Sequence, residues 1–258
     1  MRFLNAYHTD IGIKKSTNQD SVIIQQAMCD FGTVLMAGVC DGLGGLQKGE
    51  VASAAAVHAL SDWFCYILPG ILEDGMKIAV FRESMEKLIA SLNKDIHKYG
   101  EKNGCELGTT LEMILLVANR YYIFHVGDCR TYTLSKTESM IQLTKDQTYV
   151  QQQMDLGRMT VEQAKTDRMR NTLLQCIGAS DKIEIDFMEG SFKENDAFLL
   201  CCDGFRHVIT PKEIQNTILS QGEWREENMR KALITLTELN KSRGEKDNIS
   251  SILVAVVE

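Results

Sequence analysis

The pattern of apolar and polar positions divides the chain into blocks of strands and blocks of helices. Short apolar or alternating runs, typical of strands, occur at residues 3–9, 21–26 and 33–40. Two helices are predicted next, at residues 49–68 and 78–99, the second with apolar residues three and four positions apart. Two long helices directly after three strands are not a regular strand–helix alternation. The pattern therefore favours a segregated α+β fold over a doubly wound sheet.

The second half of the chain returns to strands. Strand patterns are found at residues 109–118, 121–126, 131–134, 140–143, 173–176, 183–189, 197–202 and 249–257. Several connections between them are too short for a parallel crossover, so these strands are expected to pair antiparallel. A helical excursion is predicted at residues 145–167, and further helices are predicted to start at Thr210 and to cover residues 226–241.

Composition narrows the possible classes of protein. The chain has 258 residues, only two prolines and no low-complexity linker, so one domain spanning residues 1–258 is expected. A net charge of −7 without clusters of Lys and Arg argues against nucleic-acid binding. No apolar run approaches the ~18 residues of a membrane span, and the first residues lack the apolar core of a signal peptide. No membrane association is expected.

The eight cysteines indicate the compartment. None forms a Cys-x-x-Cys pair, and most lie in apolar runs, where a free cysteine behaves as a small buried hydrophobic residue. Free thiols are typical of a reducing compartment, so a cytoplasmic location is expected.

The most informative stretch is residues 35–50. An apolar run that reads as a buried strand ends at Asp41, and four glycines follow within eight residues. Glycines allow the main chain to approach a bound ion closely, because they have no Cβ atom. Asp-Gly is also a very common turn dipeptide, so Asp41 alone indicates no more than a turn.

Five aspartates share this kind of position, each at the boundary of a predicted strand: Asp20, Asp41, Asp128, Asp203 and Asp247. Each alone is better explained as a turn residue. As a set with few histidines nearby, they are the oxygen ligands that a hard cation such as Mg²⁺ or Mn²⁺ prefers. A metal site requires that they converge in space, which their spacing in the sequence does not show.

Seven segments in order give the chain a family resemblance. They are Asn-Gln-Asp-Ser at 18–21, the glycine-rich stretch 39–45 with 49–53, Gly-Thr-Thr at 108–110, Val-Gly-Asp-Cys-Arg at 126–130, Leu-Thr-Lys-Asp at 143–146, Cys-Asp-Gly-Phe at 202–205 and Asp-Asn-Ile at 247–249. On these segments the chain resembles the compact bacterial form of the metal-dependent protein phosphatases (PPM), the type 2C serine/threonine phosphatases. The resemblance covers essentially the whole chain.

The resemblance implies a fold and a metal site. The fold would be a four-layer α-β-β-α sandwich of two antiparallel sheets flanked by helix pairs. Two ions, Mn²⁺ or Mg²⁺, would bind at one end. Asp41 would bridge both ions, the Gly42 carbonyl would bind one, and Asp203 with Asp247 would hold the other. Asp20 would act through a bound water, and Asp128 with Asp203 would form a weaker third site.

The implied reaction is hydrolysis of phosphoserine and phosphothreonine in proteins, by direct attack of a water that bridges the two metals. The expected substrates are phosphoproteins made by a bacterial-type Ser/Thr kinase, and the enzyme is expected to be a monomer. Lys15 stands where the family usually has a phosphate-binding arginine. It keeps the charge but lacks the two-pronged guanidinium group. Lys15, Asp41 and Asp203 are therefore the candidate catalytic residues.

Two other functions stay open from the sequence. A catalytically impaired relative could bind phosphoproteins without hydrolysis, although no expected metal carboxylate is missing. A metal-dependent enzyme could instead act on a small phosphate ester or a phosphodiester, although the chain has no nucleotide-binding Gly-x-x-x-x-Gly-Lys loop.

Overall fold

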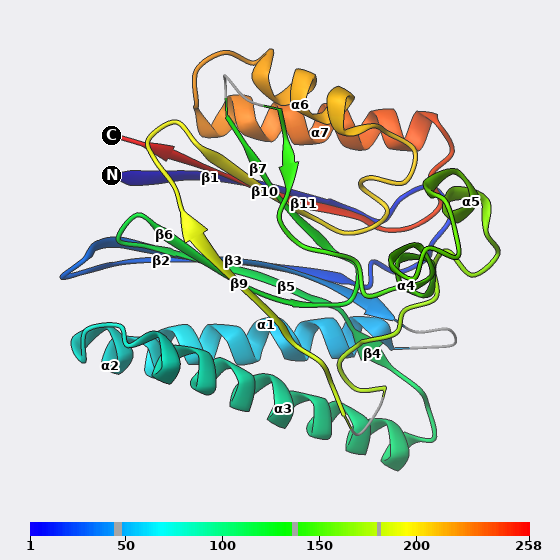
Figure 1. The fold of residues 1–258 in the computed structure, drawn as a ribbon, viewed down its shortest axis with the longest axis horizontal. Coiled ribbons are helices and arrows are strands. Elements are labelled where there is room, and N and C mark those ends of the chain that lie inside the picture. Colours follow the sequence, from blue (N-terminus) through cyan, green and yellow to red (C-terminus); the bar gives the residue numbers. More distant parts are fainter. Residues whose placement is uncertain (44–47, 136–138, 180–181) are drawn as a thin grey trace.

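Two antiparallel sheets stacked face to face form the centre of the molecule (Figure 1). The computed structural model describes residues 1–43, 48–135, 139–179 and 182–258. One pair of helices covers the outer face of one sheet, and a second group of helices covers the outer face of the other. The predicted four-layer α-β-β-α sandwich is thus confirmed.

The first sheet carries the two ends of the chain. In spatial order it contains β1 (Arg2–Asp10), β11 (Ile249–Val257), β10 (Ala197–Cys201), β7 (Arg130–Leu134) and β8 (Ile141–Gln142). Its outer face is covered by α6 (Pro211–Leu219) and α7 (Glu226–Ser242). Helix α6 starts as predicted, with a capping box in which Thr210 and Glu213 each bond the other's backbone N–H.

The second sheet contains, in order, β2 (Asp20–Cys29), β3 (Gly32–Leu43), β5 (Leu111–Val117), β6 (Arg120–Val126) and β9 (Asp186–Ser191), with β4 (Gly108–Thr109) paired to the end of β3. Its outer face is covered by α1 (Gly49–Tyr66), α2 (Leu68–Glu73) and α3 (Ile78–Asn103). Two short helices, α4 (Tyr149–Asp155) and α5 (Val161–Thr166), lie beside the sandwich. No helix in the described ranges has the length and apolarity to cross a bilayer.

Strand β3 shows how the sequence encodes the layers. Leu35, Ala37 and Val39 point between the two sheets, whereas Met36 and Cys40 point toward the helices α1 and α3. All five side chains are fully buried. A strand buried on both faces reads as a continuous apolar run, which is the pattern seen before Asp41.

Several predicted elements differ in the structure. Residues 173–176 form no strand: Leu173 makes only an isolated bridge to Thr148, because no neighbouring strand runs beside this segment. The helical excursion at 145–167 contains two short helices, and the helix predicted at 49–68 is interrupted at Ile67. The strand predicted at 140–143 is reduced to two residues, and the one predicted at 183–189 begins only at Asp186.

Candidate metal centre

The five predicted carboxylates lie at the end of the sandwich opposite the chain termini, on segments from both sheets (Figure 1). Asp20 is the first residue of β2 and Asp41 lies directly opposite it on β3. Asp128 follows β6, Asp203 follows β10, and Asp247 precedes β11. Antiparallel pairing brings these strand ends to one edge.

The sequence predicted that the strand ends at Asp41. In the structure β3 continues for two more residues, to Leu43. Gly42 and Leu43 pair with Thr109 and Gly108 of β4, which adds ladder hydrogen bonds beyond the acid. The backbone of Asp41 is fixed on the same side, since its N–H donates to Thr110 Oγ1 at 2.9 Å and its carbonyl accepts from Thr110 N–H at 2.9 Å.

Gly42 occupies a position where no side chain fits. A Cβ atom there would lie 2.3 Å from the carbonyl oxygen of Gly49 and 2.4 Å from that of Gln19. The first turn of α1 and the end of the 11–19 loop therefore close directly on Gly42. Gly44 and Gly45, also singled out in the sequence, lie outside the described residues.

Asp247 is held by its neighbours. The Glu245 carboxylate accepts from the backbone N–H groups of Lys246 and Asp247, at 2.7 and 2.9 Å. Asn248 N–H donates to Asp247 Oδ1 at 2.9 Å, and the Asn248 side-chain oxygen accepts from Gln19 N–H at 2.9 Å. Asn248 thus ties the loop of Asp247 to the residue before Asp20.

The Asp128 turn is fixed by the start of the segment at 145–167. Gly127, with a φ of +109°, gives the chain its sharp bend. Gln147 bonds both backbone groups of Gly127: its N–H donates to the Gly127 carbonyl at 2.7 Å, and its side-chain oxygen accepts from Gly127 N–H at 2.8 Å.

Buried carboxylate oxygens without partners are the main chemical feature of this site. Within the described ranges, three such oxygens have no hydrogen-bond partner: both carboxylate oxygens of Asp20, and Oδ1 of Asp203. Burial, with the charges of Asp203 and Asp247, raises the pKa of Asp20 to about 7, against the lowering effect of the nearby Ser250 and Cys202 side chains. Burial and the other four carboxylates raise the pKa of Asp41 well above its usual range. The charges of Asp203 and Asp247 act on both Asp20 and Asp41, and that of Asp128 acts on Asp41, so the five acids share one small region.

These residues fit a hard divalent cation. Unpaired buried carboxylates are costly unless a cation or proton compensates them. Oxygen ligands are what Mg²⁺ and Mn²⁺ prefer, and the close-packed Gly42 backbone suits a carbonyl ligand. Among the described residues, however, no three Asp, Glu, His or Cys side chains are already grouped as a metal site. The ligand roles therefore stay predictions.

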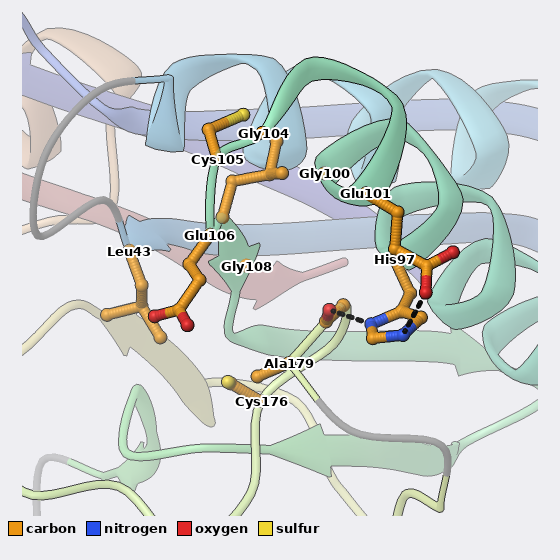
Figure 2. A pocket seen from close by; sticks show the side chains of 12 residues that line it. Leu43, His97, Gly100, Glu101, Gly104, Cys105, Glu106, Gly108, Cys176 and Ala179 are labelled. Carbon is orange, nitrogen blue, oxygen red and sulfur yellow. Dashed lines mark hydrogen bonds and ion pairs between the residues drawn. The ribbon is translucent and has the colours of Figure 1, made fainter.

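A pocket of about 650 Å³ adjoins this end of the second sheet (Figure 2). It lies between the end of β3, the end of α3 and the segment around Cys176, and Leu43 and Gly108 line it. Figure 2 shows Glu106 and Leu43 on one side and the His97–Glu101 pair on the other. None of the seven predicted site residues lines it.

Comparisons with known proteins identify the family. The sequence profile of protein phosphatase 2C matches residues 13–249. The chain belongs to the protein phosphatase 2C family. It is 31% identical over 252 residues to the serine/threonine phosphatase Stp of Listeria innocua, covering 96% of this chain and 94% of that protein. The family and the enzyme class predicted from the sequence are confirmed.

Solved structures agree with this assignment. A serine/threonine phosphatase of S. agalactiae superposes with a TM-score of 0.85 at 28% identity, covering 99% of this chain and 100% of that one. The catalytic domain of the serine/threonine protein phosphatase PstP, in complex with two manganese ions, superposes with a TM-score of 0.80 at 28% identity, covering 99% of each chain.

Three predicted ligands of this phosphatase, Asp247, Asp203 and Asp128, contact basic side chains of the chain itself. Lys15 Nζ lies 2.6 Å from Asp247 Oδ1. His207 Nε2 lies 3.3 Å from Asp203 Oδ2, and its Nδ1 lies 3.4 Å from Glu245 Oε2. The sequence singled out Lys15. It did not single out His207, Arg206 or Glu245, although the two basic residues directly after Phe205 are a visible signal.

The stability of the metal-free phosphatase is expected to fall as the pH rises from about 4 to about 7. Burial raises the pKa of Asp20 and of Asp128 to about 7, whereas carboxylates of the unfolded chain release their protons near pH 4. The folded state then binds more protons than the unfolded state over this range. Its free energy of unfolding falls by roughly 4 kcal/mol for a shift of this size in Asp20 alone.

Urea unfolding in EDTA across this pH range measures the effect. Asp20→Asn should flatten the slope, and saturating Mn²⁺ should reduce it, because the cation compensates the ionised carboxylates. If neither the substitution nor Mn²⁺ changed the slope, these acids would not be the groups that bind extra protons in the folded state.

Proposed function

We propose that this phosphatase hydrolyses phosphoserine and phosphothreonine in proteins, using two divalent ions, Mn²⁺ or Mg²⁺. The observation that carries the proposal is the set of buried carboxylate oxygens of Asp20 and Asp203 that have no partner among the described residues. The serine/threonine specificity named for the Listeria and S. agalactiae relatives, and the two manganese ions of PstP, support it.

The proposed ligands follow the edge where the strands end. Asp41 would bridge the two ions and the Gly42 carbonyl would bind one of them, while Asp203 and Asp247 would hold the other. Asp20, opposite Asp41 on β2, would act through a water. Asp128, with Asp203, would bind a third ion more weakly.

The chain's own residues have distinct tasks in this proposal. Two bound ions would supply an activated water and positive charge for in-line displacement at phosphorus. Asp41 would be held for this purpose by its hydrogen bonds to Thr110. Lys15, whose ammonium group lies at the edge of the carboxylate cluster, would bind the substrate phosphate, at the cost of its contact with Asp247.

Further parts of the proposal concern the cell. The substrates would be products of a bacterial-type Ser/Thr kinase, and the enzyme would act as a monomer with one catalytic domain over residues 1–258. A cytoplasmic location is supported by the cysteines: all eight lie in the described ranges and none forms a disulfide.

Phosphate release from a phosphothreonine peptide during a Mn²⁺ titration tests the function. Release should require the metal and fall about a thousandfold in Asp203→Asn, since several kcal/mol of charge stabilisation depend on the ions. Asp30→Asn, in the exposed turn after β2, is the matched control and should behave like the wild type. A folded protein that releases no phosphate at any Mn²⁺ concentration would contradict the proposal, and faster release from a nucleotide would redirect it to another substrate class.

A further inference from the structure

Arg206 and His207, the consecutive residues after Phe205, each contact a different carboxylate of the predicted third metal site. Both backbone N–H groups donate to the Asp203 carbonyl, at 3.0 and 3.1 Å, which forms the tight turn after β10. From this turn the Arg206 side chain reaches Asp128 and the His207 ring reaches Asp203. The two carboxylates expected to bind a third ion therefore already have partners within the chain, a guanidinium group at Asp128 and an imidazole ring at Asp203.

The Arg206 contact is the more extensive one. Its Nη2 donates to the backbone carbonyl of Asp128 at 2.7 Å, lies 3.5 Å from Asp128 Oδ2, and lies 3.3 Å from Asp146 Oδ2. All three side chains are nearly buried, with 10 or 11% of their surface exposed. Solvent screens the attraction between these charges less than it would at the surface, although burial also removes both charges from water.

Two arginines lie beside Asp128 and Asp146. Arg130 binds Asp146 with two parallel hydrogen bonds, at 2.6 and 2.7 Å, and Arg206 lies between Asp146 and Asp128. Two arginines thus face two aspartates. Arg206 also raises the cost of a third ion directly, because a divalent cation at Asp128 would lie next to a guanidinium group that Asp146 and the Asp128 carbonyl hold in place.

We infer that Arg206, assisted by His207, takes the place of the third metal ion in this phosphatase, so that the chain itself places a positive charge beside Asp128 and only two ions bind tightly. Arg206 is a positioning residue in this scheme, since it acts through Asp128. The inference rests on the proposed function, because it presupposes the two-ion centre.

Counting bound Mn²⁺ tests it without any activity measurement. The full chain is titrated with Mn²⁺ and the free ion is followed by its EPR signal, for the wild type, Arg206→Met, Arg206→Lys and the double variant Arg206→Met with Asp128→Asn. Circular dichroism and the thermal midpoint establish that each variant is folded.

The wild type should bind two ions tightly. Arg206→Met should bind a third at least about tenfold more tightly than the wild type does, because a repelling charge is gone. Arg206→Lys, which keeps the charge, should resemble the wild type, and the double variant should lose the gain. His207→Ala, at a more exposed position, should also strengthen third-ion binding and decides the matter if Arg206→Met does not fold.

Different results would contradict the inference about Arg206 and the proposed metal-dependent function. Three ions of similar affinity in the wild type would overturn it, as would weaker or unchanged third-ion binding in folded Arg206→Met, or unchanged binding in His207→Ala where that variant decides. Each of those results leaves the two-ion phosphatase intact. A folded wild type that binds no Mn²⁺ would instead overturn the metal centre itself, and this inference with it.

Discussion

Asp41→Asn should abolish phosphate release and at the same time stabilise the metal-free protein. The charges of the other four carboxylates act on Asp41, and burial together with these charges raises its pKa well above the usual range. Asparagine has nearly the same shape and carries no charge, so it removes this repulsion from the folded state. We expect the free energy of unfolding in EDTA at pH 7.5 to rise by at least about 1.4 kcal/mol, the equivalent of one pKa unit.

The same substitution should cost nearly all activity. A neutral amide would bridge two divalent ions poorly, and the loss of several kcal/mol of charge stabilisation lowers kcat about a thousandfold or more. Urea unfolding in EDTA and turnover of a phosphothreonine peptide in Mn²⁺ measure the two effects, with Asp30→Asn as control. An active Asp41→Asn, or one that is less stable without metal, would remove Asp41 from the centre of the cluster.

The region of Asp41 was predictable because its signal is local. The apolar run of β3 identifies a buried strand, and the polar loop of residues 10–20 sets where β2 begins. The sequence did not show that Asp20 and Asp41 meet: the two-residue turn at 30–31 sets the antiparallel register in which these two acids lie opposite each other. His125, within the apolar strand β6, is fully buried, and its Nδ1 lies 2.5 Å from Glu112 Oε2.

The contacts of Arg206 and His207 were not predictable in the same way. They depend on where the turn after β10 lies relative to the turn after β6 and the loop before β11, and these segments are far apart in the sequence. The matching segment at 202–205 ends at Phe205, so nothing drew attention to the next two residues.

The strand predicted at residues 173–176 was wrong for a related reason. It has the apolar character of a strand, but a strand exists only where another strand pairs with it. Here the available contacts are single bridges, Leu173 to Thr148 and Ile177 to Thr109. Local pattern thus predicts strands well when the fold supplies a neighbour and poorly where the chain passes beside the sheets.

Substitution of Lys15 is expected to have the second large effect on activity. Because Lys15 contacts Asp247, the substitution should change both phosphate binding and metal binding. The ammonium group lies 2.6 Å from Asp247 Oδ1, and both side chains are over a third exposed, at 39 and 34%. Burial works against its charge, but the hydrogen bond and charge of Asp247, with Asp41 and Asp203, raise the pKa of Lys15. Lys15 is thus charged at neutral pH, and its ammonium group can bind either the substrate phosphate or the Asp247 carboxylate.

Lys15→Ala should raise KM for a phosphopeptide about ten- to a hundredfold, because a charged hydrogen bond to the phosphate is lost. It should also lower the Mn²⁺ concentration needed for half-maximal activity, since Asp247 no longer binds the ammonium group. Lys15→Arg should keep KM at or below the wild-type value, because guanidinium binds phosphate with two prongs. Lys14→Ala, at the exposed neighbouring position, is the control. An alanine variant at position 15 with unchanged KM and unchanged metal requirement would remove Lys15 from both roles, whereas a change in the metal requirement alone would leave it only as the partner of Asp247.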